Sequence, residues 1–320
     1  MTQHADARER RKGLIAIGVV TVIWGLNFVL AHPVAVAADP FAMTFIRAVV
    51  AAVVFLPIAL LKGQRHLLTA KNLLAALPLA VACILFNQVL FLLATRHTTP
   101  THVAVIVATI PVWVALVAWL FLGERLARRR VLGIALAFVG VTVMALARHQ
   151  GGTSHPSPHG DMLAVLAAAS FAAFTVGNKA LVGRVGAFAA TALVYLVGTV
   201  VLLPFAWKGL SSGDLLRLTT SELLSAAYVV VASTLIAYPL FSYALSRLTA
   251  SRVAVFTYLQ PTLAATLSFA LGWERFPPAT LAGAGMAVLG VVLAQKRSQA
   301  TVESAPLVET IEAQAEAPGL

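Results

Sequence analysis

The sequence predicts an all-α integral membrane protein with ten transmembrane helices, arranged as two inverted repeats of five helices each. Three observations lead to this prediction: the composition, a series of apolar segments of membrane-spanning length, and an internal repeat. Hydrophobic residues occupy 60% of the 320 positions and charged residues 11%, whereas a soluble domain has about 45 to 50% and about 25%. A water-soluble core cannot bury that much apolar surface.

Charged residues, glycine, proline and histidine divide the chain into ten apolar segments, each about as long as a tilted membrane-spanning helix. The first segment follows four cationic residues and therefore resembles a secretory signal. Its length, and the nine similar segments after it, indicate a retained span instead. The predicted spans are residues 13–31, 40–61, 72–94, 101–122, 130–147, 161–180, 187–207, 222–245, 251–272 and 278–295.

The distribution of lysine and arginine predicts the orientation in the membrane, because cytoplasmic loops retain positive charge. With the N-terminus inside, 17 of the 23 cations fall on the cytoplasmic side and five on the other, while Arg47 lies within the second segment. We therefore expect a multi-pass protein of the plasma (inner) membrane with both termini cytoplasmic. The cations recur in short clusters between apolar segments, so the net charge of +11 indicates contact with membrane lipid and not a nucleic-acid partner.

An internal repeat supports the division into two halves, because residues 103–125 align without gaps on residues 253–275. Each half holds five predicted spans, an odd number, so the second half enters the membrane from the opposite side. The expected parts are a cytoplasmic N-terminal segment (1–12), a first five-helix repeat (13–147), an extracytoplasmic linker (148–159), a second repeat (160–295) and a disordered cytoplasmic tail (296–320). The matched pairs include Val103 and Val253, Ala104 and Ala254, Pro111 and Pro261, Glu124 and Glu274, and Gly133 and Gly283.

Four short motifs add a family resemblance to this pattern. They are Trp24-Gly25-Leu26-Asn27, Phe45-Ile46-Arg47, the Ala-x6-Pro-x12-Glu signature around Pro111 and Pro261, and Gly160-Asp161. Together they resemble the EamA branch of the drug/metabolite transporter superfamily over residues 13–295. The resemblance implies a secondary transporter that moves a small organic solute by alternating access, and an exporter of amino acids, related metabolites or drugs. A nucleotide-linked or sugar-type solute stays open as the alternative substrate. Trp273 departs from the pattern, since the first repeat has Gly123 there.

Polar and aromatic side chains recur at helical spacing on several predicted spans. Rings and amide or hydroxyl groups together suit a cavity for a small organic solute, although each polar group has interhelical hydrogen bonding as an alternative role. Thr21, Phe91, Ser170, Asn178 and Thr234 belong to the same pattern. The candidate substrate-binding residues are Trp24, Asn27, Arg47, Asn87, Gln88, Phe174, Tyr238, Ser242, Tyr258 and Gln260.

Arg47 and two prolines have both a functional and a structural interpretation. Burying a cation inside a span costs about 2.5 to 3.5 kcal/mol, so Arg47 either binds a substrate carboxylate or ties helices together through carbonyl groups, and the structural role is favoured. Pro111 and Pro261 each remove a helix hydrogen bond and are expected to be hinges or simple bends. Small residues four apart, Gly133 with Ala137 and Gly283 with Ala287, predict close helix packing or a homodimer face.

The acidic residues fall in loops, tails or span ends, with Asp39, Glu124, Asp161, Glu222 and Glu274 the nearest to the lipid. A carrier that couples protons through a mid-membrane carboxylate is therefore disfavoured. Coupling would use a terminal carboxylate, a histidine such as His32 or His102, or solute exchange, and facilitated diffusion is equally compatible.

The chain has no HExxH or GxSxG motif and no buried acidic pair, so neither a metal nor a cofactor is expected. A membrane-embedded enzyme would need such groups, and a structural or receptor-like protein would be favoured by large extramembrane loops. Both remain as alternatives to the transporter.

Overall fold

The chain folds into helices that are long and apolar enough to cross a membrane. The structure, a computed structural model, describes residues 2–62, 68–122, 128–146, 157–250, 253, 256–273 and 278–295, and the regular structure within these ranges is entirely helical. Many large apolar side chains on these helices are exposed, among them Leu74, Val200 and Leu224, as expected of surfaces that face lipid. Within these described ranges, seven helices qualify as candidate spans by length and composition: Arg8–Leu30, Pro40–Leu61, Ala70–His97, Pro100–Val117, Pro158–Val185, Ala187–Ser211 and Thr220–Arg247.

The first half of the chain follows the predicted segments with several differences. The first helix begins at Thr2 and runs through the cationic segment instead of starting near residue 13, and a short helix forms at His32–Ala37, where a loop was expected. The third segment is a composite whose middle is a π-helix. The elements are α1 (Thr2–Leu30), α2 (His32–Ala37), α3 (Pro40–Leu61), α4 (Ala70–Ala80), η2 (Val81–Gln88), α5 (Val89–His97), α6 (Pro100–Val107), α7 (Ile110–Leu122) and α8 (Arg128–Leu146).

The second half repeats this order, including a π-helix in its third segment. Its elements are α9 (Pro158–Val185), α10 (Ala187–Ser211), the 3-10 helix η3 (Asp214–Leu216), α11 (Thr220–Val230), η4 (Val231–Ile236), α12 (Ala237–Arg247), the 3-10 helix η5 (Phe256–Leu259), α14 (Gln260–Ala270) and α15 (Pro278–Gln295). Both ends of α11, and the start of its π-helical continuation, lie 150 residues after those of α4. This is the spacing of the sequence repeat.

The two prolines that match in the internal repeat each follow an interruption of a helix. Pro111 is the second residue of α7, which is separated from α6 by Ala108 and Thr109. Pro261 is the second residue of α14 and follows the 3-10 turn η5. A proline in the first turn of a helix costs no hydrogen bond, because that N–H has no intrahelical partner. The prolines therefore start new helices and do not bend continuous ones.

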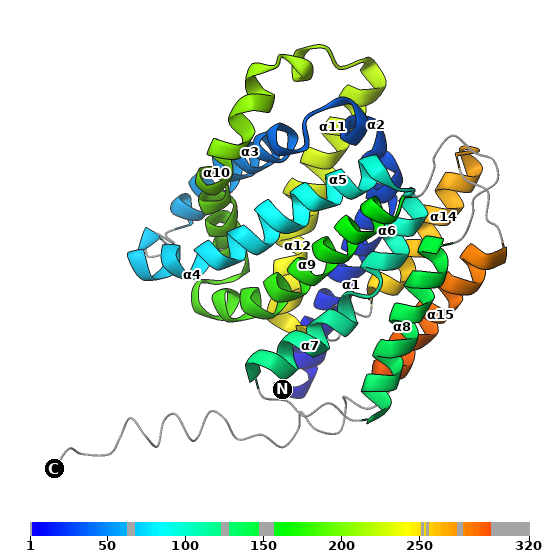
Figure 1. Ribbon diagram of the computed structural model, residues 1–320. Helices are drawn as coiled ribbons and strands as arrows, with labels where there is room; N and C mark the ends of the chain where they lie inside the picture. The colour runs from blue at the N-terminus through cyan, green and yellow to red at the C-terminus, as the bar shows by residue number, and fades with distance from the viewer. Residues whose placement is uncertain are drawn as a thin grey trace.

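The small residues of α8 and α15 bring these two helices into backbone contact. A Cβ added at Gly140 would overlap the backbone of Ala287 and Gly283, and one added at Gly290 would overlap that of Ala137 and Gly133. Figure 1 shows α8 and α15 side by side along their length. The predicted close packing is therefore found within one chain.

Three further pairings surround the centre of the molecule (Figure 1): α3 lies along α10, α1 packs against α12, and α5 packs against α9. The main hydrophobic core lies between these helices and includes Phe55, Phe171 and Tyr195. Glu124 and Glu274, much of the linker 148–159 and the whole tail 296–320 lie outside the described residues.

Candidate functional site

A cavity lies between helices of both halves of the described structure. Its empty volume is about 520 Å³, counting the space that opens to solvent. Helices of the first half contribute most of the wall, and α9, η4, α12 and α14 of the second half close it. The lining residues are Trp24, Asn27, Phe28, Arg47, Asn87, Gln88, Phe91, Val107, Ile110, Phe171, Ser233, Tyr238 and Gln260.

Trp24 is the centre of an aromatic cluster on one side of the cavity. The centroid of its ring system lies 5.5 Å from that of Phe171, 5.2 Å from Tyr238 and 5.3 Å from Phe241. Its indole Nε1 donates to the carbonyl of Ser233 at 3.2 Å, in the π-helical η4. Since ring contacts and a hydrogen bond fix the indole, it forms a rigid apolar wall.

A second, smaller hollow lies beside this cluster. It has an empty volume of about 300 Å³ and is lined by residues that include Thr21, Thr175, Phe241 and Phe256. Trp24, Ile110, Phe171 and Gln260 line both hollows. These four side chains therefore form the partition between the two spaces.

Arg47 is a buried cation on the cavity wall, with only 3% of its surface exposed. Its Nε donates to the Thr234 hydroxyl at 3.0 Å, and that hydroxyl donates at 2.8 Å to the carbonyl of Val229, five residues earlier. Among the described residues, no carboxylate pairs with Arg47 and its Nη atoms make no hydrogen bond. The site therefore carries a positive charge that the described protein groups do not neutralise.

Amide side chains complete the polar part of the wall. Asn87 donates from Nδ2 to the carbonyl of Ala167 at 3.0 Å, and Gln88 donates from Nε2 to the Tyr195 hydroxyl at 2.9 Å. The Oδ1 atom of Asn27 and the Oε1 atom of Gln88 have no hydrogen-bond partner within the described part of the chain. Buried polar atoms are normally paired, so these two acceptors are candidates for contact with a bound molecule.

The structure brings most of the predicted site residues together. Those on the cavity wall are Trp24, Asn27, Arg47, Asn87, Gln88, Tyr238 and Gln260; their role in substrate binding stays a prediction.

Two predicted residues, Phe174 and Ser242, are not among the described residues that line this wall. Phe174 is buried in the core against Phe241, Ser242 accepts a hydrogen bond from Thr191 at 2.8 Å, and the side chain of Tyr258 lies outside the described part of the structure.

Several lining residues were missing from the sequence-based set, and two of them are neighbours of residues in the predicted pattern. Phe28 follows Asn27, and Phe171 follows Ser170, whose hydroxyl instead bonds to the carbonyl of Leu166. The apolar Val107 and Ile110 line the cavity because the helix is interrupted between them. Ser233 lies in η4, and no sequence pattern marks either π-helix.

An all-helical chain with several membrane-spanning helices around a partly polar internal cavity is a multi-pass membrane protein of the carrier type. The chain belongs to the EamA-like transporter family, which it matches over residues 11–146 and 158–295. This identifies it as a transporter of the drug/metabolite type, as the motifs indicated.

Individual relatives cover nearly the whole chain. An uncharacterized transporter of Archaeoglobus fulgidus is 25% identical over 89% of this chain and 99% of the relative. A probable amino-acid metabolite efflux pump of Salmonella typhimurium is 29% identical over 89% of this chain and 94% of the relative. The uncharacterized inner membrane transporter YedA of Escherichia coli is 23% identical over 87% of this chain and 89% of the relative.

A protein known from a crystal structure shares the fold, with a TM-score of 0.59 over 90% of this chain and 96% of the other, at 17% sequence identity.

Proposed function

We propose that this chain is a secondary transporter that exports a small carboxylate-bearing solute, an amino acid or a related metabolite, across the plasma membrane by alternating access. The substrate binds in the central cavity, against Arg47 and the Trp24 cluster. The observation that carries the proposal is the buried, uncompensated charge of Arg47 on the cavity wall. The amino-acid metabolite efflux pump named among the relatives supports the substrate class.

The proposed architecture is ten spans in two inverted halves, residues 13–147 and 160–295, with both termini cytoplasmic. The equal spacing of α4 with α11, and of their π-helical continuations, supports the duplication. The charge bias between alternate loops supports the orientation. Two inverted halves give an inward-open and an outward-open state of similar energy, which is the basis of alternating access.

The chemistry of the cavity favours an anion or a zwitterion over a cation. A buried charge without a partner is costly, and a substrate carboxylate placed against the guanidinium of Arg47 would remove that cost through charge-assisted hydrogen bonds. No acidic side chain is among the lining residues that the structure describes. A substrate amino group would lie against the rings of Trp24 and Tyr238, by cation–π attraction, or near the free acceptor of Asn27.

The test is counterflow in proteoliposomes that hold the purified protein, with a panel of radiolabelled amino acids, organic acids and cationic drugs. We expect the outflow of unlabelled solute to drive a saturable accumulation of one or more labelled carboxylates. We expect no accumulation of the cationic drugs. Accumulation of cationic drugs alone would contradict the assigned role of Arg47. Absence of counterflow for the whole panel would favour a non-transporting membrane protein.

A further inference from the structure

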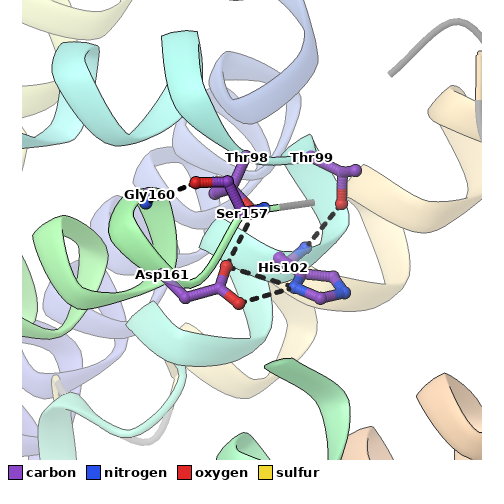
Figure 2. Close-up of polar contacts among 6 residues, drawn as sticks. All are labelled: Thr98, Thr99, His102, Ser157, Gly160 and Asp161. Carbon is purple, nitrogen blue, oxygen red and sulfur yellow. Dashed lines mark hydrogen bonds and ion pairs between the residues drawn. The ribbon is translucent and has the colours of Figure 1, made fainter. Parts of the chain in front are cut away.

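A buried histidine and a buried aspartate, 59 residues apart in the sequence, contact each other where α6 and α9 begin (Figure 2). The Nδ1 atom of His102 lies 3.1 Å from both carboxylate oxygens of Asp161, and the Thr98 hydroxyl donates to Oδ1 at 2.7 Å. His102 is fully buried and Asp161 is 3% exposed. Figure 2 shows the carboxylate directed at the imidazole ring, with Thr98 on its other side.

Helix ends hold both partners in place. Thr99 caps α6 by accepting from the backbone N–H of His102, and Ser157 caps α9 by accepting from that of Gly160. The N–H of Ser157 in turn donates to the hydroxyl of Thr98. Asp161 lies in the first turn of α9, where the helix dipole favours an anion. The pair therefore joins the start of α9 to the α5–α6 connection.

This contact lies at one end of the cavity. Phe91 on α5 and Val107 on α6 line the cavity, and His102 is five residues from Val107, about 7.5 Å along the helix. A Cβ added at Gly160 would overlap the backbone of His97 and Thr98. Separation of α9 from the α5–α6 connection would therefore break the His102–Asp161 pair.

The N-terminal end of α1, far from the His102–Asp161 pair, has a contact of different chemistry. There Glu9 accepts from Nε of Arg247 on α12 at 2.8 Å, and both side chains are about a third exposed. The C-terminal end of α1 leads to His32, whose Nδ1 atom lies 3.0 Å from the carbonyl oxygen of Thr95 on α5. The two contacts are thus at opposite ends of α1, and among the described residues the buried histidine lies at the His102–Asp161 end.

We propose that His102 and Asp161 form a proton-binding site whose occupancy favours closure of the cavity at the end where α5, α6 and α9 meet. With neutral His102 and ionised Asp161 the buried pair has a net charge of −1. One proton from solvent, added to the imidazole, converts it to an ion pair with no net charge. Burial of a net charge costs more than burial of a neutral, hydrogen-bonded pair, so closure favours the protonated form.

The direction of the pH effect follows from this difference in bound protons. The closed end binds more protons than the open end, so closure is favoured as pH falls and lost as pH rises. Uptake of one proton per closure changes the closed-to-open ratio by at most about tenfold per pH unit.

Other titratable and charged groups lie near this end. Arg96 and His97 are exposed at the end of α5, His159 is exposed at the start of α9, and His32 precedes α3. The rings of His97 and His159 contact each other with centroids 5.4 Å apart. Among the described residues, α14 and α15 carry no charged side chain. His97 and His159 are exposed and His32 is only partly buried, so replacement of these three histidines is the control.

The test measures closure directly, without substrate. The inference rests on the alternating access of the proposed function. Because the distance measurement needs no substrate, it can refute the His102–Asp161 site even if the transported solute has not been found. Spin labels are placed at Val36→Cys on α2, which packs against α5, and at Leu166→Cys on α9, in a Cys83→Ala background; both label sites are exposed. The distance between the two labels is measured by pulsed electron–electron double resonance in nanodiscs from pH 5.5 to pH 8.

We expect the ratio of short to long distances to rise as pH falls, by between about threefold and tenfold per pH unit. His102→Gln and Asp161→Asn each abolish this dependence, and the triple variant His32→Gln, His97→Gln and His159→Gln retains it. A wild-type distribution that does not change with pH overturns the proposal. So does a pH dependence that survives in His102→Gln or Asp161→Asn, or one that is lost in the triple variant. If one pair variant does not fold, the other decides.

Discussion

Replacing Arg47 with glutamine separates its charge from its hydrogen bond to Thr234. Glutamine removes the cation and keeps an amide that can reach a neighbouring hydroxyl. A hydrogen bond to a charged group contributes about 1.5 to 3 kcal/mol, and about 1.4 kcal/mol corresponds to a tenfold change in a dissociation constant. We therefore expect carboxylate solutes to bind about 10- to 150-fold more weakly to Arg47→Gln.

The matched control is Thr234→Val, which removes the acceptor of the Arg47 Nε hydrogen bond and leaves the charge in place. The solute found by counterflow is titrated against each purified variant, and unfolding temperatures are measured in parallel. If Arg47 only ties α3 to η4, the two variants will lose similar stability and Arg47→Gln will bind the solute within about threefold of wild type. That result would refute the carboxylate-binding role.

Further expectations concern the aromatic cluster, the α8–α15 contact and the orientation. Trp24→Ala removes three ring contacts of about 0.5 to 1.5 kcal/mol each; counterflow should fall at least tenfold, and equal loss in Trp24→Phe would argue against a packing role. Gly140→Ala forces a Cβ into the backbone of Ala287 and should destabilise by about 1 to 3 kcal/mol or more, seen as a lower unfolding temperature. Gly285→Ala, on α15 with open space around it, should be neutral or stabilising, and equal loss in both would contradict the reasoning. Reporter fusions should place both termini in the cytoplasm, and a periplasmic signal from either would contradict the orientation.

The helices could be predicted from the sequence because lipid imposes a length and an apolar composition on each of them. Cavity residues such as Trp24 and Gln260 could be predicted for a related reason: the polar groups of their side chains are costly in lipid and therefore face protein. Which side of each helix faces the cavity was harder to predict from the sequence. Ser170 bonds to its own helix while the adjacent Phe171 faces the cavity, an error of one residue on a helix that is apolar on all sides.

Two features required the three-dimensional structure. The π-helices η2 and η4 add one residue per turn and change which side chains face the cavity, and the sequence has no pattern that marks them. The pairing of His102 with Asp161 joins residues on different helices. The sequence placed Asp161 at a span end, and the packing of α5, α6 and α9 buries it.

The backbone contact between α8 and α15 makes this helix pair a fixed reference frame. Because each helix fits its glycines against the other's backbone, neither can slide or rotate without collision. Displacements during a transport cycle must then be absorbed by segments with interrupted hydrogen bonding, such as the α6–α7 junction and η5. Probes attached to α8 and α15 should keep a constant separation throughout the cycle, and can serve as the origin from which the movement of every other helix is measured.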